Sequence, residues 1–323
     1  MGIAVPCEKE KAMLRIYKTI ENTIEETEVL EAGCWISAIA PTEAEISKLE
    51  TELKIDRDYI RSALDEEESS RIESDEGQTL IVLDYPVAEK ADGEEKNFSY
   101  YTMPMGIILT DKYVITVCLK ENSIIDDFAK GVVKNVKTQF KTRFIFCLLL
   151  RIAAKYLQFL KQIDKIFNYA QKQLHKAMTN KALLQLLSLE KSLVYFSTSL
   201  KNTETVLEKL LRGRIIKLYD EDQELLEDVL VEVKQAIEMS NIYSNILSNT
   251  MDAYSNVISN NLNQAMKVLT VITIVLELPT IVFSFYGMNV SDLPFPQTLP
   301  ALGIAAVLAV TAALILTKSK FYK

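Results

Sequence analysis

The hydrophobic and polar positions of this chain follow three different patterns from one end to the other. Between Glu28 and Lys120, short apolar runs alternate with turn residues; from Ser123 to Arg214, apolar residues recur with helical spacing; beyond Val268 they merge into two long stretches. Short apolar runs are typical of strands, a 3.6-residue period of amphipathic helices, and ~20 apolar residues of a membrane span. The sequence therefore predicts an α/β part, a helical part and a membrane part.

The first part, residues 1–122, is predicted to be an α/β domain. We expect strands at 33–40, 79–85, 105–109 and 113–119, and helices at 42–53 and 56–64. Thr42 is the candidate N-cap of the first helix, because its hydroxyl can accept a hydrogen bond from a free N–H of the first turn. The charged segment 88–97 is expected to be a loop between strands.

The second part is predicted to be helical. Residues 143–178 and 183–214 have helical periodicity and are joined by a turn at 179–181, which indicates an antiparallel hairpin within residues 123–219. A third helical pattern begins near Asp220 and continues without Gly or Pro into the first long apolar stretch. As one helix over 220–286 it would extend ~100 Å. Such a helix needs partners, either the hairpin or copies of itself.

The two long apolar stretches are predicted to be transmembrane helices at about 267–286 and 299–317. Residues 268–285 contain one charge, Glu277, and residues 299–316 contain none. The connecting loop, 287–298, holds no Lys or Arg, whereas Lys267 precedes the first span and three lysines lie in the tail, 318–323. The positive-inside rule then places both termini in the cytoplasm and the loop outside. We expect a multi-pass protein of the inner or plasma membrane, with the lipid bilayer as a partner and no signal peptide.

Polar residues recur along one face of the long helical pattern. In the first span they follow alternating spacings of three and four: Thr270, Thr273, Glu277, Thr280 and Ser284. Before the span a similar series comprises Asn245, Asn249, Asp252, Asn256 and Asn263. These residues either face solvent individually or surround a water-filled axis formed by several copies. Because lipid offers no hydrogen bonds and two spans cannot enclose a pore, a pore would require a symmetric oligomer.

Composition limits the chemistry that such an oligomer could perform. The formal net charge is -8, which argues against nucleic acid as a partner and is compatible with cations. Four scattered cysteines and a single histidine suit soft metals poorly, whereas rings of Asn, Thr and Asp oxygens suit hard cations. There is no P-loop pattern and no nucleophile–base pair. We therefore expect no organic cofactor and no enzyme activity.

Several motifs resemble the CorA family of magnesium transport proteins over nearly the whole chain. The strongest is Tyr286-Gly287-Met288-Asn289 at the outer end of the first of two C-terminal spans, with Met266-Lys267-Val268-Leu269-Thr270 at its start. Weaker matches are Cys34-Trp35-Ile36, Pro41-Thr42-Glu43, Leu64-Asp65-Glu66-Glu67-Glu68, Arg71-Ile72-Glu73 and Gly106-Ile107-Ile108-Leu109-Thr110.

This resemblance implies a funnel-shaped homopentamer with a cytoplasmic α/β domain, a long stalk helix continuous with the pore-lining span, and a second span outside it. Asn289 would ring the outer mouth and bind hydrated Mg²⁺, with Gly287 allowing a tight backbone and Met288 packing. Asp252, Asn263 and Thr280 correspond to polar rings of the pore, and Leu269 to an apolar gate. Asn256, Met266, Thr270, Thr273 and Ser284 complete the expected lining.

The chain departs from the family pattern at two places. Glu277 occupies the second apolar gate, where it either faces the lumen or is protonated or turned to a neighbouring helix. In the first case, Glu277→Gln should change cation selectivity or the pH dependence of uptake. The second departure concerns the regulatory Mg²⁺ site between subunits: Asp228 matches one ligand, but Ser62 replaces its partner, and Asp65 or Glu66 lies close enough to substitute.

The leading functional hypothesis is a divalent cation channel or transporter that takes up Mg²⁺ down its electrochemical gradient and is gated by cytoplasmic Mg²⁺. Transport of Co²⁺, Ni²⁺ or Zn²⁺ on the same scaffold, as uptake or efflux, is the alternative. A membrane-anchored scaffold protein is a third class, but it would not need a polar face on its first span.

Overall fold

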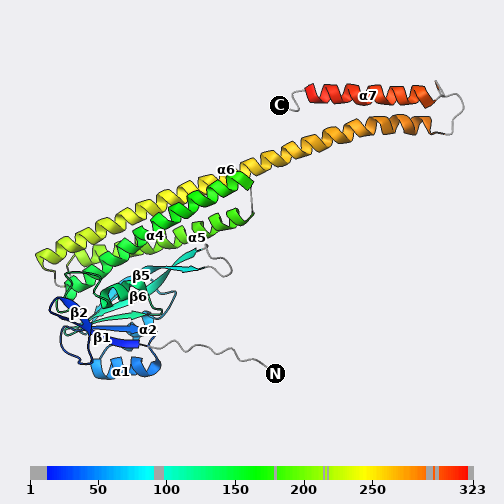
Figure 1. The fold of residues 1–323 in the computed structure, drawn as a ribbon. Helices are drawn as coiled ribbons and strands as arrows, with labels where there is room; N and C mark the ends of the chain where they lie inside the picture. The colour runs from blue at the N-terminus through cyan, green and yellow to red at the C-terminus, as the bar shows by residue number, and fades with distance from the viewer. Residues whose placement is uncertain are drawn as a thin grey trace, which may run out of the picture. The chain divides into compact units, whose positions relative to one another are not determined.

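The computed structural model describes residues 13–90, 98–177, 180–213, 215–216, 218–288, 294 and 298–318. It divides into two compact units, Met1–Ser248 and Asn249–Lys323. The first unit contains a mixed sheet with helices, and the second contains helices (Figure 1).

A seven-stranded sheet organises the first unit, in the order β2-β1-β3-β7-β6-β5-β4. The strands are β1 (Met13–Ile20), β2 (Thr23–Glu26), β3 (Trp35–Ile39), β4 (Arg71–Asp75), β5 (Gln78–Lys90), β6 (Phe98–Leu109) and β7 (Val114–Cys118). The central pair, β3 and β7, is parallel, and the other pairs are antiparallel. This confirms the α/β character that the sequence predicts.

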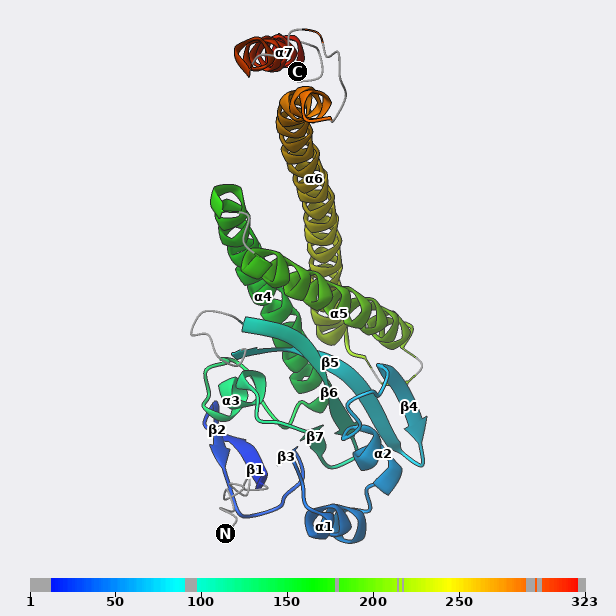
Figure 2. The ribbon, with the colours of Figure 1, turned by 90° about the vertical axis from the view of Figure 1, so that its right-hand side faces the viewer.

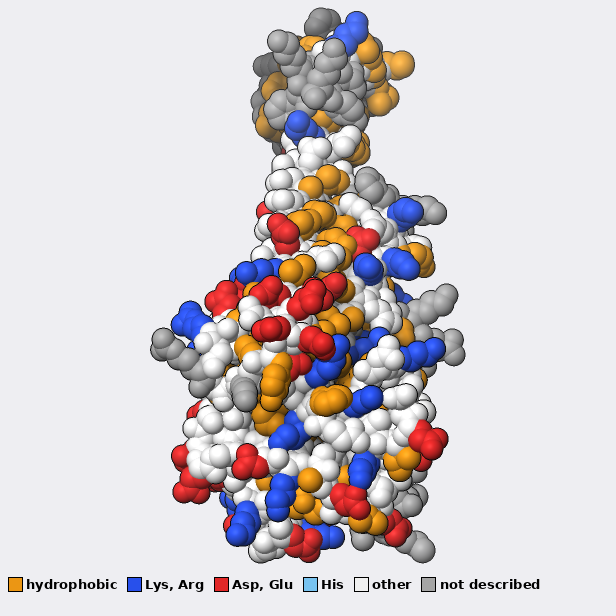
Figure 3. Space-filling model, turned by 90° about the vertical axis from the view of Figure 1, so that its left-hand side faces the viewer, with side chains coloured by type: hydrophobic (Ala, Val, Ile, Leu, Met, Phe, Trp, Pro, Cys, Tyr) orange, Lys and Arg blue, Asp and Glu red, His pale blue; other side chains and the backbone are white. Residues whose placement is uncertain are grey.

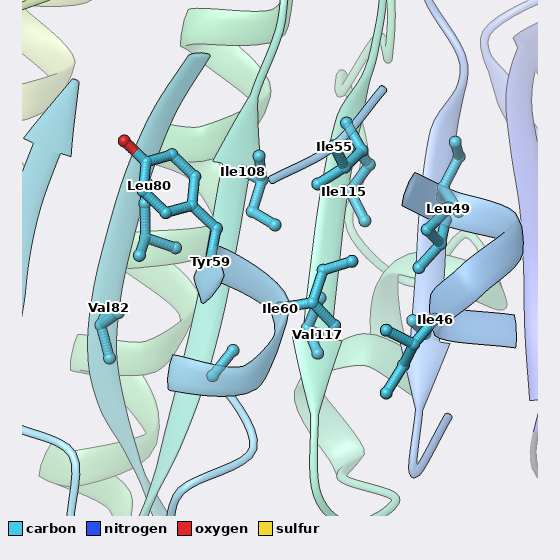
Figure 4. Packing of buried hydrophobic residues seen from close by; sticks show 13 residues of the cluster. Ile46, Leu49, Ile55, Tyr59, Ile60, Leu80, Val82, Ile108, Ile115 and Val117 are labelled. Atoms are coloured by element: carbon cyan, nitrogen blue, oxygen red, sulfur yellow. The ribbon is translucent and has the colours of Figure 1, made fainter. Parts of the chain in front are cut away.

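Two short helices, α1 (Glu43–Leu53) and α2 (Arg57–Ser62), cover one face of the sheet. Ile46 and Leu49 of α1, with Tyr59 and Ile60 of α2, pack on alternate residues of the central strands, such as Ile115 (Figure 4). As predicted, Thr42 is the N-cap of α1: its hydroxyl accepts from Glu45 N at 3.3 Å, and Glu45 Oε2 accepts from Thr42 N at 2.9 Å. This capping box satisfies two of the free donors at the helix start.

The opposite face of the sheet carries aromatic side chains and packs against three helices, α3 (Ser123–Ala129), α4 (Lys141–Ala177) and α5 (Asn180–Leu211). Trp35 is fully buried; its ring lies against Phe128 and Phe144, and its Nε1 donates to Thr116 Oγ1 at 2.9 Å. Figure 2 shows the sheet between these helices and α1 and α2. The unit is therefore a three-layer α/β/α structure.

The long helix α6 (Asp220–Tyr286) contains 67 residues, as the uninterrupted pattern predicts. Its first part packs in the first unit through Leu226, Val229 and Val233, which are buried. Ser240 Oγ donates to the Leu193 carbonyl of α5 at 3.1 Å, and Ser197 Oγ to Asn241 Oδ1 at 3.2 Å. Of the two partners that the sequence allows for this helix, the structure shows the hairpin of α4 and α5 packed against its first part.

The second unit consists of the later part of α6 and α7 (Thr298–Lys318). Among the residues described, α6 is the helix long and apolar enough to cross a membrane. The apolar part of α7, Ala301–Leu316, is shorter than that criterion requires. The second predicted span therefore remains a prediction.

The structure also corrects several sequence predictions. Strands β1, β2 and β4 were not predicted, because their outward charged residues mask the alternation; β2 and β4 are the edges of the sheet, where charge discourages further pairing. Residues 88–90 belong to β5 and are not part of a loop, and 91–97 lie outside the described residues. Helix α5 begins at Asn180, inside the predicted turn.

Candidate functional site

One face of α6 carries the polar series that the sequence singled out. We call it the α6 stripe: Asp252, Asn256, Asn263, Met266, Leu269, Thr270, Thr273, Glu277, Thr280 and Ser284. At ~100° per residue, all of them project within roughly 80° of Glu277 around the helix axis. Every member is exposed in the single chain, including the apolar Leu269, which is 64% exposed. The stripe is therefore a continuous uncovered face within the second unit.

The covered residues of the same helix segment all lie away from the stripe. Seven residues between Val268 and Tyr286 are partly or fully buried: Val268, Val271, Val275, Leu278, Pro279, Val282 and Tyr286. All project roughly 100° or more away from Glu277. Buried Ala301 and Ala305 lie on α7, which runs beside this end of α6 (Figure 1), and the Tyr286 hydroxyl donates to the Pro294 carbonyl at 3.0 Å. Within this unit, the partly and fully buried side chains of α6 therefore lie away from the stripe.

Three threonines of the stripe use their hydroxyl protons within the helix. Thr270 Oγ1 donates to Met266 O at 2.8 Å, Thr273 Oγ1 to Leu269 O at 2.9 Å, and Thr280 Oγ1 to Leu276 O at 3.0 Å. A hydroxyl oxygen whose proton is engaged still has a lone pair to offer as an acceptor. These residues therefore present oxygen acceptors, which suit water and hard cations.

Glu277 is the one charged residue between Val268 and Tyr286. Its side chain is exposed, and the described part of the chain provides it with no hydrogen bond or ion pair. Thr311, in the middle of α7, donates to the carbonyls of Val307 and Leu308 in its own helix. The alternative in which Glu277 turns to a neighbouring helix thus finds no support in α7.

The end of α6 is compact. Gly287 N donates to Phe283 O at 2.9 Å, and Met288 N to Phe285 O at 3.4 Å. A Cβ at Gly287 would lie 3.1 Å from Phe283 O, closer than ordinary contact, so glycine suits this position. Met288 is 46% exposed. Asn289, the predicted cation-binding residue, lies outside the described residues.

The predicted regulatory carboxylates all lie on the surface. Asp228 is exposed on α6, and Asp65 and Glu66 are exposed in the turn after α2, where Asp65 Oδ1 accepts from Glu67 N at 3.0 Å. Ser62, at the departed position, accepts from Arg71 Nη2 at 3.1 Å. The described portion of the chain contains no group of three His, Cys, Asp or Glu residues that could hold a metal ion. The regulatory site that the sequence predicts between subunits therefore stays a prediction.

A further acidic residue, Asp84 on β5, was not singled out from the sequence. It lines a cavity of about 640 Å³ bounded by the turn after α2, strands β5 and β6, and α5. Asp84 Oδ2 accepts from Ser199 Oγ at 2.6 Å, and its carbonyl accepts from the Tyr156 hydroxyl at 3.1 Å. Burial raises the pKa of Asp84, and the bond from Ser199 opposes this effect. The available signal was an acid inside the apolar run 79–85.

Comparison with known proteins gives consistent likenesses. The family model described as CorA-like Mg²⁺ transporter protein matches residues 31–318. The chain is 28% identical over 264 residues to the cobalt/magnesium transport protein CorA of Methanocaldococcus jannaschii, covering 80% of this chain and 81% of that protein.

Two solved structures share the fold. The complete structure of the CorA magnesium transporter from M. jannaschii has a TM-score of 0.78 at 24% identity and covers 94% of this chain and 96% of that chain. The cytoplasmic domain of ZntB from Vibrio parahaemolyticus has a TM-score of 0.60 at 10% identity and covers 77% of this chain and 99% of that chain. The first likeness includes the long helix as well as the α/β unit.

Proposed function

The chain belongs to the family of CorA-like Mg²⁺ transporter proteins, and we propose that it is a homopentameric channel for Mg²⁺ uptake down the electrochemical gradient. It would reside in the inner or plasma membrane with both termini in the cytoplasm. In this proposal α6 lines the pore, and α7 is the second span outside it.

The observation that carries this proposal is the opposed coverage of α6. The residues of the membrane segment that are covered within the second unit lie away from the stripe, while the stripe, with its hydroxyls and Glu277, is uncovered in a single chain. A polar face cannot remain in contact with lipid, because lipid supplies no hydrogen bonds. If several copies place their stripes around a water-filled axis, the polar side chains no longer face lipid. The number of five copies is taken from the family, because the spacing of the polar residues does not determine it.

Each level of the proposed pore has a defined task. Asn289 forms the outer ring that holds hydrated Mg²⁺ through outer-shell hydrogen bonds, which suits an ion that dehydrates reluctantly. Gly287 and Met288 shape that mouth. Thr270, Thr273, Glu277, Thr280 and Ser284 line the membrane segment, Met266 and Leu269 form an apolar constriction, and Asp252, Asn256 and Asn263 line the inner approach.

Cytoplasmic Mg²⁺ would regulate this channel by bridging subunits. Asp228 of one subunit and Asp65 or Glu66 of the next supply the carboxylates, all of which are exposed in the single chain. A cation bound between subunits stabilises the closed arrangement, in which its ligands lie together. Loss of Mg²⁺ would remove this stabilisation and allow the channel to open.

Transport of Co²⁺, Ni²⁺ or Zn²⁺ is the second candidate function. The M. jannaschii relative is named for both cobalt and magnesium, and the ZntB domain shares the fold. Competition by each of these ions for Mg²⁺ flux separates the two candidates: efficient competition with independent flux of the competitor favours the broader specificity.

Ion flux into liposomes tests the proposed function. Asn289→Ala should abolish Mg²⁺ entry while the oligomer remains intact by size-exclusion chromatography, because the outer ring loses its amide ligands. Gln297→Ala, which removes an amide elsewhere in the same connection, is the matched control and should conduct normally. Full Mg²⁺ flux through an intact Asn289→Ala oligomer would contradict the proposal.

A further inference from the structure

We infer that Glu277 is a specificity-determining residue of the proposed pore, whose carboxylate favours the passage of divalent over monovalent cations. This inference rests on the proposed function. It concerns the position where this chain places a charge within an otherwise apolar and hydroxyl-bearing span.

Glu277 lies near the middle of the membrane segment of α6. It follows Lys267 by ten residues and precedes Tyr286 by nine. At ~1.5 Å per residue, this places it roughly 14–15 Å from each, within a hydrocarbon core of ~30 Å. A carboxylate at this depth is costly to hold in lipid, so its environment must supply water, protein or cations.

The coverage of α6 determines which environment is available. The nearest covered residues, Leu278, Val275 and Val282, project roughly 100° or more away from Glu277 around the helix axis. Residues 301–316 of α7 contain no charged side chain, and the nearest charge along α6 is Lys267, about three turns away. Among the residues that the structure describes, no cationic side chain therefore pairs with this carboxylate, which projects with the stripe toward the proposed axis.

Its immediate neighbours add oxygen and no positive charge. Thr273 lies about one turn before Glu277 and Thr280 just under one turn after it, and both hydroxyl protons are engaged by backbone carbonyls. Symmetry would bring the same three residues from each subunit to one level of the axis. That level is then acidic and lined by acceptors.

The physical consequence is a preference for higher charge. The attraction between a fixed charge and an ion is proportional to the ion's charge and is stronger in the low dielectric of a membrane pore than in water. A divalent ion therefore gains about twice the attraction of a monovalent ion at the same distance. Removing the carboxylate should affect Mg²⁺ more than Na⁺.

The test compares Mg²⁺ and Na⁺ flux through the full chain in liposomes. Glu277→Gln, which keeps the shape and removes the charge, should lower the Mg²⁺-to-Na⁺ flux ratio by roughly tenfold or more, an effect of about 1.4 kcal/mol. Glu277→Asp keeps the charge and should retain most of the ratio. Thr311→Val, which removes a polar group from α7, is the control and should leave the ratio unchanged.

A second variant separates charge from folding effects. In Glu277→Cys, a negatively charged methanethiosulfonate reagent should restore the Mg²⁺-to-Na⁺ flux ratio, and a positively charged reagent should lower it further. The wild-type chain treated with the same reagents controls for reaction at its native cysteines. The inference about Glu277 alone is overturned if neither the glutamine substitution nor the reagents change the Mg²⁺-to-Na⁺ flux ratio while Mg²⁺ flux still depends on Asn289. Intact wild-type oligomers that pass no divalent cation overturn the proposed function as well.

Discussion

Asp84 is a half-buried carboxylate whose raised pKa predicts a pH-dependent stability of the α/β unit. It sits among the buried residues Leu83 and Tyr85 of β5 and lacks a cationic partner among the described residues. Its hydrogen bonds come from neutral groups on α4 and α5, Tyr156 to its carbonyl and Ser199 to its carboxylate. These bonds tie the strand to the helices but do not offset the cost of burying an ionised group.

Replacing Asp84 by Asn should remove this pH dependence. Because the pKa of Asp84 is raised in the folded protein, the unfolded chain loses its proton first as pH rises above ~3.9. Between the ordinary and the raised pKa, the free energy of unfolding of the wild type should fall with increasing pH, and that part of the dependence should be absent in Asp84→Asn.

Urea unfolding at pH 4 and pH 7, followed by fluorescence of Trp35, the single tryptophan, measures this difference. Asp111→Asn, at an exposed turn, is the control and should keep the wild-type dependence. Identical pH dependences in wild type and Asp84→Asn would contradict the assigned role of burial.

At the residue scale, the sequence singles out a side chain that differs from a uniform background, and the role of that side chain stays a prediction. Glu277 in a membrane-length apolar run is costly wherever it points, so it was singled out at once. Asp84 lies in a run of seven residues, which is consistent with a strand that has one solvent-exposed face. Only the packing of α5, whose Ser199 donates to Asp84, shows that helices cover this face. Long-range packing, which the local pattern does not encode, made the difference.

At the scale of elements, α1 illustrates a helix boundary that local chemistry specifies. The capping box of Thr42 and Glu45 fixes its start, and the helix carries Ile46 and Leu49 into the core between α1 and the sheet. Loss of the cap should therefore weaken core packing and not only the first turn.

We predict that Thr42→Ala lowers the free energy of unfolding by about 1 kcal/mol, because the first turn loses a side-chain acceptor. Thr51→Ala in the same helix is the matched control: the Thr51 hydroxyl donates to the Ser47 carbonyl, and alanine favours the helix. Urea unfolding of both variants measures the difference. Equal stability of Thr42→Ala and wild type would show that the cap is dispensable.

Elements differed in how well the sequence predicted them, for physical reasons. The 67 residues of α6 were predicted because no Gly or Pro interrupts them before Pro279, and helix formation is local. Strands β1, β2 and β4 were missed because a strand depends on its neighbours in the sheet, and the charges of Arg15, Lys18 or Glu73 obscure a two-residue period.

At the scale of the whole molecule, the proposed assembly accounts for both the uncovered stripe of α6 and the isolated surface carboxylates of the first unit. The sequence indicated both sets, since polar periodicity and family motifs are visible in one chain. It did not define the regulatory ligands, because a site shared by two subunits depends on their relative placement, and Ser62 departs from the family pattern.

Mg²⁺ should stabilise the assembled protein through the carboxylates that bridge its subunits. Asp228, Asp65 and Glu66 are exposed in the single chain, and pairing such groups around a cation relieves their mutual repulsion. A ligand that binds only the native assembly raises its stability as its concentration exceeds Kd, by about 2.7 kcal/mol at a hundredfold excess. The melting temperature of the full chain in detergent should thus rise with MgCl₂ at constant ionic strength.

Asp228→Asn should reduce this Mg²⁺-dependent rise, whereas Glu238→Gln, which removes an exposed carboxylate elsewhere on α6, should leave it unchanged. An equal rise in all three proteins would assign the stabilisation to sites other than Asp228, such as the pore. A melting temperature insensitive to Mg²⁺ in the wild type would argue against any metal bridge between subunits. Measuring oligomer size in parallel distinguishes a lost metal site from a lost assembly, because only the former leaves the oligomer intact at low temperature.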